Sequence, residues 1–257
     1  MARLLFVTTI LATVIVSGCQ PTNVQEQSTT TSSSLRNRSA ELHVDLGIRY
    51  LREGNLDFAF SRLSRALDLE PNNAAAHNAM GLLHERLGDA AKADGYYRRA
   101  VTLNPTDASA QTNLGSSLCR AAKYEEGEKF LLQAAKQPLH KSPEVIYTNL
   151  GLCALLADKP ERAETYFRRS LEINPKMSGA LIRMSELSYR QDRYLSARAY
   201  LQRYLVEAEH SPASLWLGVR IERELGDKNA EASYGMLLRS KFPDAAQTRL
   251  LEESKNQ

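Results

Sequence analysis

The sequence lacks a marked excess of charge of either sign. Its 33 lysines and arginines are nearly balanced by 30 aspartates and glutamates, which gives a net charge of +3 at pH 7. Proteins that bind the phosphate backbone of nucleic acids usually present a much larger positive charge. We therefore expect no nucleic-acid partner for this chain.

The sequence also lacks the residue patterns that carry enzyme chemistry. No glycine-rich loop opens a helix as in phosphate-binding sites, and no Ser/His/Asp or Cys/His arrangement stands out. His43 and His77 have no carboxylate or cysteine spaced to complete a four-ligand metal site. These absences predict a protein that is not an enzyme and that has no metal, no cofactor and no small-molecule substrate.

The longest apolar run lies at the N-terminus, over residues 4–16. It is shorter than the roughly 20 residues that a membrane-spanning helix needs, and it has the proportions of a signal peptide. The run ends in Val-Ser-Gly-Cys19, which resembles the bacterial lipobox, where a diacylglyceryl group is attached to the cysteine thiol. We interpret residues 1–18 as a lipoprotein signal peptide and Cys19 as the site of lipid attachment. An ordinary signal peptide followed by a chance cysteine is the alternative.

The residues after Cys19 are expected to form a tether. Gln20 stands where an aspartate would favour retention in the inner membrane, so the resemblance to bacterial lipoproteins implies a lipid anchor on the periplasmic face of the outer membrane. Serines and threonines fill residues 28–34, and few side chains in the stretch can be buried. Segments of this composition do not fold alone. We predict that residues 19–39 are a lipidated cysteine and a disordered tether.

A period of 34 residues organises the rest of the chain. Gly47, Gly81 and Gly115 each follow an apolar residue and are 34 residues apart, and Ala59 and Ala93 keep the same spacing. This pattern is typical of the tetratricopeptide repeat, a helix–turn–helix unit. We predict an all-α, right-handed superhelical solenoid of about six such repeats over residues 40–257. The expected repeats are 40–73, 74–107, 108–143, 144–177, 178–210 and 211–243, followed by a short capping helix.

The concave face of such a solenoid is lined by the first helix of each repeat. In the first repeat the inward positions hold Val44, Ile48 and Leu51, and in the second they include Asn78 and Leu82. An apolar strip on a concave surface suits an amphipathic helix or an extended apolar peptide. We predict a partner-binding groove at these five residues. Alternatively, the N-terminal segment or a neighbouring repeat covers them.

Two cysteines remain after Cys19. Cys119 and Cys153 fall on the first helices of adjacent repeats, 34 residues apart. The periplasm is oxidising, and two neighbouring thiols there pair when their Cα atoms lie within roughly 7 Å. The sequence leaves a disulfide, buried free thiols and a reactive site open.

Segments outside the repeat consensus resemble the PilF/PilW family of type IV pilus biogenesis and stability lipoproteins, the pilotins of the pilus secretin. The segments are 149–152 (NLGL), 194–200 (YLSARAY), 215–220 (LWLGVR), 232–235 (ASYG) and 242–243 (FP). The resemblance implies an outer-membrane protein that binds secretin subunits and promotes their localisation and multimerisation, without catalysis. The alternative is a periplasmic lipoprotein scaffold for cell-wall or other envelope enzymes.

Overall fold

The computed structural model describes residues 24–137 and 142–254, with side chains from residue 34 onward. The described residues form thirteen α-helices and no strand. The helices are α1 (Val24–Glu53), α2 (Leu56–Leu69), α3 (Ala74–Arg86), α4 (Ala90–Leu103), α5 (Ala108–Arg120), α6 (Tyr124–Ala135), α7 (Pro143–Leu156), α8 (Pro160–Ile173), α9 (Ser178–Arg190), α10 (Tyr194–Glu207), α11 (Pro212–Leu225), α12 (Lys228–Lys241) and α13 (Ala246–Glu253).

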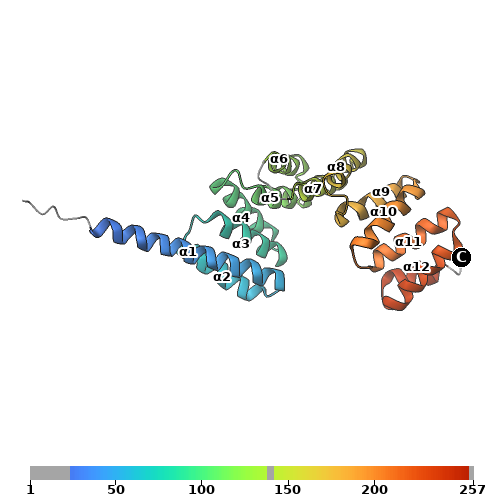
Figure 1. Cartoon of the computed structure of the whole chain (residues 1–257), viewed down its shortest axis with the longest axis horizontal. Helices are drawn as coiled ribbons and strands as arrows, with labels where there is room; N and C mark the ends of the chain where they lie inside the picture. The colour runs from blue at the N-terminus through green and yellow to red at the C-terminus, as the bar shows by residue number, and fades with distance from the viewer. Residues whose placement is uncertain (1–23, 138–141, 255–257) are drawn as a thin grey trace, which may run out of the picture.

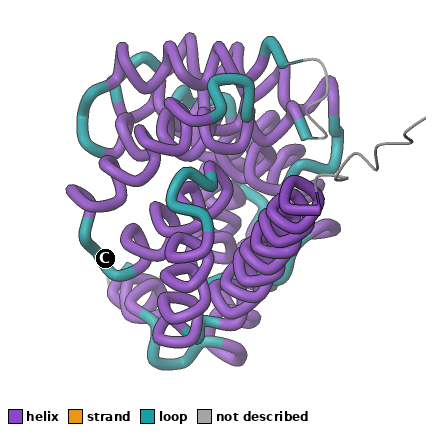
Figure 2. The backbone as a smooth tube through the Cα atoms, turned by 90° about the vertical axis from the view of Figure 1, so that its left-hand side faces the viewer, coloured by secondary structure: helices purple, strands orange, loops and turns teal. Residues whose placement is uncertain are grey.

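The first twelve helices form six consecutive pairs, and each pair corresponds to one expected repeat. Figure 1 shows the pairs along an arch, with α1 and α2 at one foot, α6 to α8 at the crown, and α11 and α12 at the other foot. Apart from the connection that contains residues 138–141, short loops join the described helices (Figure 2). The prediction of an all-α solenoid of six helical repeats with a short last helix is confirmed.

Local hydrogen bonds and backbone conformations determine where the helices of a repeat begin and end. The side chain of Asn73 accepts a hydrogen bond from the backbone nitrogen of Ala76 at 2.8 Å, which caps α3. Between the two helices of the repeats, the chain takes up a left-handed conformation, as at Gly54 (φ 79°) and Gly88 (φ 78°). The third, fourth and fifth repeats adopt the same conformation without glycine, at Ala122, Asp158 and Asp192.

Replacing Ala122 with glycine is therefore expected to stabilise the protein by about 1 kcal/mol. In the left-handed region the Cβ atom of alanine crowds the backbone, and glycine has no Cβ atom. Urea denaturation followed by circular dichroism measures the gain. Ala121→Gly is the matched control, because Ala121 has a negative φ of −82° and gains nothing from glycine. Equal effects of the two substitutions would contradict the prediction.

The periodic glycines allow the two helices of a repeat to approach closely. A Cβ atom added to Gly81 would lie 2.4 Å from the ring of Tyr97 on the second helix. Tyr97 is fully buried, as is Leu63, which packs against Gly47 in the same way.

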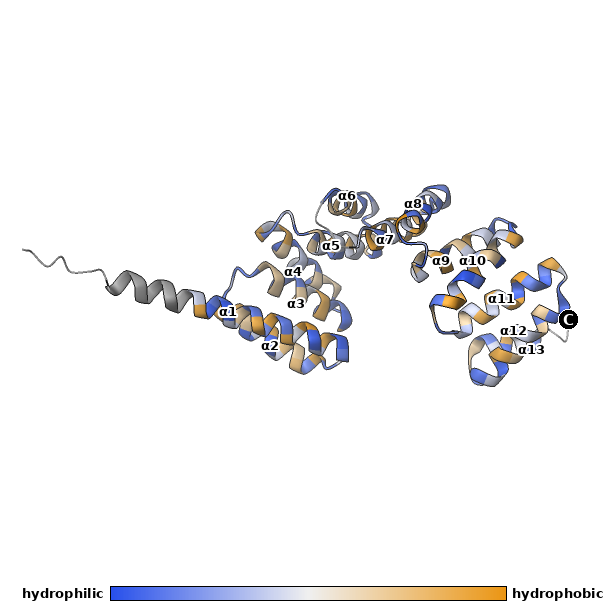
Figure 3. Ribbon diagram, in the orientation of Figure 1, coloured by the Kyte–Doolittle hydropathy of each residue, from blue (hydrophilic) through white to orange (hydrophobic). Residues whose placement is uncertain are grey.

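No described helix is long and apolar enough to cross a membrane. Figure 3 shows polar and apolar residues mixed along each repeat helix, as expected for helices that bury one face.

The predicted disordered tether does not agree with the structure from residue 24 onward. Helix α1 begins at Val24, so its first sixteen residues belong to the stretch predicted to be disordered. Residues 34–38 are exposed, and the first buried side chain is Ala40. Extending a helix costs much less than starting one, and the packed part of α1 provides the start. The predicted signal peptide and the predicted lipid-attachment site at Cys19 lie outside the described residues.

The first helices of the repeats follow one another along one side of the solenoid. Contacts join α1 to α3, α3 to α5, α5 to α7, and α9 to α11. Helices α7 and α9 pack less closely than these pairs. The first helices therefore form a continuous surface that is loosest between the fourth and fifth repeats.

Candidate functional site: a cavity on the concave face

The predicted apolar strip on the first repeat is largely buried by the second repeat. Val44 and Leu51 are each 4% exposed. Val44 packs with Ala66 and Ala76, and Leu51 belongs to the core that joins the first two repeats. The prediction that these two residues face a partner does not hold, because α3 packs against α1 and covers them.

The other three predicted groove residues are half-buried. Ile48 and Leu82 pack against the same core as Leu51. Asn78 accepts a hydrogen bond from Nδ2 of Asn113 at 2.9 Å, which ties α3 to α5. The N-terminal repeats therefore offer little free apolar surface at these positions.

The concave face opens instead in the middle of the solenoid, where α5, α7 and α9 surround a cavity of about 390 Å³. Its lining combines apolar side chains with several arginines and one glutamate. The residues are Ser116, Cys119, Arg120, Asn149, Leu152, Cys153, Leu155, Leu156, Arg183, Glu186, Leu187 and Arg190. The volume is in the range of pockets that bind small molecules or peptide side chains.

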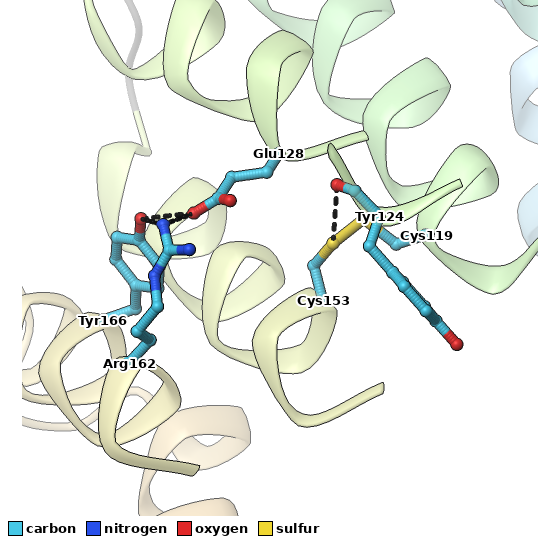
Figure 4. The surroundings of a disulfide bond; sticks show 6 residues. All are labelled: Cys119, Tyr124, Glu128, Cys153, Arg162 and Tyr166. Atoms are coloured by element: carbon cyan, nitrogen blue, oxygen red, sulfur yellow. Dashed lines mark hydrogen bonds and ion pairs between the residues drawn. A yellow bond between two sulfur atoms is a disulfide. The ribbon is translucent and has the colours of Figure 1, made fainter. Parts of the chain in front are cut away.

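Two of the lining residues, Cys119 and Cys153, form a disulfide bond, which Figure 4 shows with its surroundings. It joins α5 to α7, its Cα atoms are 5.3 Å apart, and both cysteines are 3% exposed. Of the three possibilities that the sequence left open, the structure has the bridge. The bond fixes two walls of the cavity relative to each other.

The third repeat makes room for this disulfide through Gly127. This residue occupies the second-helix position that holds alanine in the other repeats, as at Ala93 and Ala163. A Cβ atom on Gly127 would lie 2.4 Å from Sγ of Cys119 and 2.7 Å from the backbone oxygen of Gly115. The third repeat therefore has glycine in place of alanine here because a Cβ atom would clash with Cys119 and Gly115.

Replacing Gly127 with alanine is expected to destabilise the protein by about 1–3 kcal/mol, because the added methyl group overpacks the core. The loss should occur although alanine favours a helix by about 1 kcal/mol over glycine. Gly95→Ala on α4 is the matched control, since a Cβ atom there meets nothing within 4 Å. Urea denaturation should show the control to be stabilised. A stabilised Gly127→Ala protein would contradict the prediction.

Leu156, which lines the cavity, interrupts a column of arginines at equivalent positions of the repeats. Five residues after the glycine or serine of the first helix, the repeats carry arginine, except in the fourth repeat, where Leu156 takes this place. The column consists of Arg52, Arg86, Arg120, Leu156, Arg190 and Arg223. Aligning the six repeats by this position would have indicated Leu156 as unusual from the sequence alone.

Two arginines of the column bond to the preceding repeat, Arg86 to the backbone oxygen of Leu51 and Arg120 to Glu85. Arg120 is 2.5 Å from the carboxylate of Glu85, and Tyr97 donates a hydrogen bond to the same carboxylate at 2.9 Å. Burial and the charge of Glu85 raise the pKa of Tyr97, which keeps this proton on the phenol. In the fourth repeat, Leu155 stands where Glu85 stands in the second. Arg190 therefore has no ion pair with a described residue.

A second cavity of about 200 Å³ continues the surface toward the C-terminus. It lies between α9, α11 and α13 and shares Glu186 and Arg190 with the first cavity. Its wall includes Arg220, whose guanidinium carbon is 4.2 Å from the ring centroid of Tyr189. The two cavities thus form one groove along the concave face of the third to sixth repeats.

The side chains of this groove are of the kinds that bind a partner. Among the described residues, no group of three His, Cys, Asp or Glu side chains could hold a metal ion. The groove presents guanidinium groups and leucine side chains, which recognise carboxylates and apolar surface. Away from this groove, His84 stacks on the ring of Tyr96, and His77 contacts the same ring at a tilted angle.

Comparison with known families agrees with the helical pairs. Two models of the tetratricopeptide repeat match the chain, one over residues 106–176 and the other over 44–108 and 157–214. The chain belongs to the tetratricopeptide repeat family. Within this family it is a PilF/PilW-like protein, as the following relatives show.

The chain is 29% identical to the type IV pilus assembly protein PilF of Pseudomonas aeruginosa over 245 residues, which are 95% of this chain and 96% of the relative. The solved structure of Pseudomonas aeruginosa PilF superposes with a TM-score of 0.76 and covers 85% of this chain and 99% of that one. PilW, described as a widely conserved type IV pilus biogenesis factor, shares the fold with a TM-score of 0.76 at 24% identity, over 82% of this chain and 97% of its own.

Proposed function

We propose that this protein is an outer-membrane pilotin lipoprotein that binds type IV pilus secretin subunits and promotes their localisation and multimerisation. The observation that carries the proposal is the similarity to a type IV pilus assembly protein over 95% of the chain. The repeat models end at residue 214, whereas this similarity spans nearly both full lengths. It therefore reflects more than the packing consensus of the repeats.

The N-terminal sequence supports the location that we propose. Cys19 ends an apolar run within a Val-Ser-Gly-Cys motif, and lipid chains on it would each contribute about 0.8 kcal/mol per buried CH₂ group. Two or more chains anchor a protein stably to a membrane. In this proposal the lipid places the solenoid at the outer membrane, where its concave groove is available to a secretin subunit.

The test is a Cys19→Ala substitution in cells that assemble the pilus. The protein should move from the membrane to the soluble fraction, and secretin multimers should decrease in heat-resistant gel bands. Thr22→Ala, three residues further on, leaves the lipobox intact and is the control. Normal secretin multimers in the Cys19→Ala strain would contradict the proposal.

The partner is identified by crosslinking in intact cells. A photoreactive residue in place of Ser116, which lines the concave cavity, should capture the secretin. The same residue in place of Arg65, on the exposed side of α2, should not. Capture of cell-wall enzymes without secretin would favour the envelope scaffold instead.

A further inference from the structure

The cavity between α7 and α9 leaves part of its apolar surface exposed. Leu156 is 51% exposed, and Leu152 and Leu155 are half-buried beside it. In the other repeats an arginine at the position of Leu156 keeps the surface polar. A concave surface with this composition favours the burial of an apolar side chain from a partner.

The charges around this apolar surface leave one guanidinium group unneutralised. Arg120 pairs with Glu85, and Arg183 pairs with Glu186 at 2.7 Å. Arg190 also lines the cavity and has no ion pair with a described residue, because Leu155 stands where a glutamate would be needed. The positive charge of the cavity that no described carboxylate pairs with is thus that of Arg190, which lines the same cavity as Leu155 and Leu156.

We propose that this cavity binds an extended segment of the partner in which a leucine-sized side chain stands beside an aspartate or glutamate. The apolar side chain packs against Leu152, Leu155 and Leu156, and the carboxylate pairs with Arg190. Guanidinium groups bind carboxylates through two parallel hydrogen bonds, which fixes the orientation of the segment. This inference rests on the proposed function and specifies which kind of secretin segment is recognised.

The second cavity, between α9, α11 and α13, favours the binding of an extended segment and not of a single side chain. Glu186 and Arg190 line both cavities, so a peptide bound at Leu156 can continue along α9 toward α11. There the guanidinium of Arg220 lies over Tyr189 and adds a second positive group. The charge of the groove therefore complements an acidic segment along its length.

The test uses overlapping synthetic peptides that cover the mature secretin, with affinity measured by fluorescence anisotropy on the full soluble protein. The tightest peptide should contain an apolar residue next to an acidic one. Arg190→Glu and Leu156→Arg should each weaken its binding at least about 10-fold. Leu156→Arg is compatible with folding, because arginine occupies this position in the other repeats. Arg65→Glu, an exposed residue of α2, makes the same charge change outside the groove and should leave the affinity within about 2-fold.

A charge swap tests the contact itself. A peptide whose acidic residue is replaced by lysine should bind wild-type protein weakly and the Arg190→Glu protein more tightly. Unchanged affinity of both groove variants, while wild-type protein still captures full-length secretin, would overturn the inference and leave the proposed function standing. Failure of wild-type protein to capture secretin in cells would instead contradict the proposed function.

Three further results would also overturn the inference. Binding that is lost when the peptide C-terminus is amidated would assign the cavity to a terminal carboxylate. Tight peptides without an acidic residue would remove the role of Arg190. A dimer in sedimentation experiments that Leu156→Arg converts to a monomer would assign the cavity to a second copy of this chain.

Discussion

Replacing Arg198 with alanine is expected to lower the free energy of unfolding by about 3–5 kcal/mol. Glu222 on α11 is only 2% exposed, and Nε of Arg198 on α10 donates a hydrogen bond to its Oε1 at 3.0 Å. The hydrogen bond to Glu222 raises the pKa of Arg198, so the arginine remains charged. The substitution would leave a buried carboxylate without its counterion, which is the costly case for an ion pair.

Two further variants separate the buried charge from the loss of side-chain contacts. Arg198→Met combined with Glu222→Leu removes both charges and should recover the stability to within about 1 kcal/mol of wild type. Arg49→Ala breaks an ion pair with Glu53 whose side chains are 75% and 43% exposed, and it should cost less than about 0.5 kcal/mol. Urea denaturation gives all three values. A loss at Arg198 no greater than that at Arg49 would contradict the prediction.

The ion pair between Arg198 and Glu222 also joins the last two repeats. Arg198 belongs to the fifth repeat and Glu222 to the sixth, and Asp227 at 3.4 Å adds a second carboxylate. Stacked repeats contact only their neighbours, so each interface must be stable by itself. We therefore expect the Arg198→Ala protein to unfold first at its C-terminal end, which hydrogen exchange of α11 and α12 would detect.

The fold could be predicted in detail because the repeat pattern encodes packing directly. Gly81 and Tyr97 predict a close contact between two helices, and the structure places them against each other. The extent of α1 could not be predicted in this way. Residues 24–39 contain many serines and threonines, which disfavour helices on intrinsic propensity, but they are attached to a packed helix.

The candidate site was harder to predict than the fold. The helical register correctly identifies Val44 and Leu51 as apolar positions on α1, but it does not say whether the next repeat covers them. The departure at Leu156 is visible in the sequence once the repeats are compared position by position. The lack of an ion pair between Arg190 and any described residue is not visible in the sequence, because it depends on which neighbouring side chains lie within reach.

Removing the disulfide by Cys119→Ala with Cys153→Ala is expected to cost about 3–4 kcal/mol of stability. The bond closes a loop over a sequence separation of 34 residues, and the chain-entropy model gives this value for a loop of that length. Denaturation of wild-type protein in the presence of a reducing agent should show a similar loss. Equal stability of the oxidised protein and the double variant would contradict the prediction.

The same variant tests why Gly127 replaces alanine. Of the two close approaches that a Cβ atom on Gly127 would make, the one to Sγ of Cys119 at 2.4 Å disappears with the disulfide, and the one to the oxygen of Gly115 at 2.7 Å remains. Gly127→Ala should therefore cost less in the disulfide-free protein than in wild type, with a coupling of about 0.5–3 kcal/mol in a double-mutant cycle. Additive effects would show that Gly127 serves the approach of α5 and α6 alone. A coupling of this sign would show that Gly127 and the disulfide depend on each other, and that the third repeat departs from the consensus to accommodate the disulfide that lines the cavity.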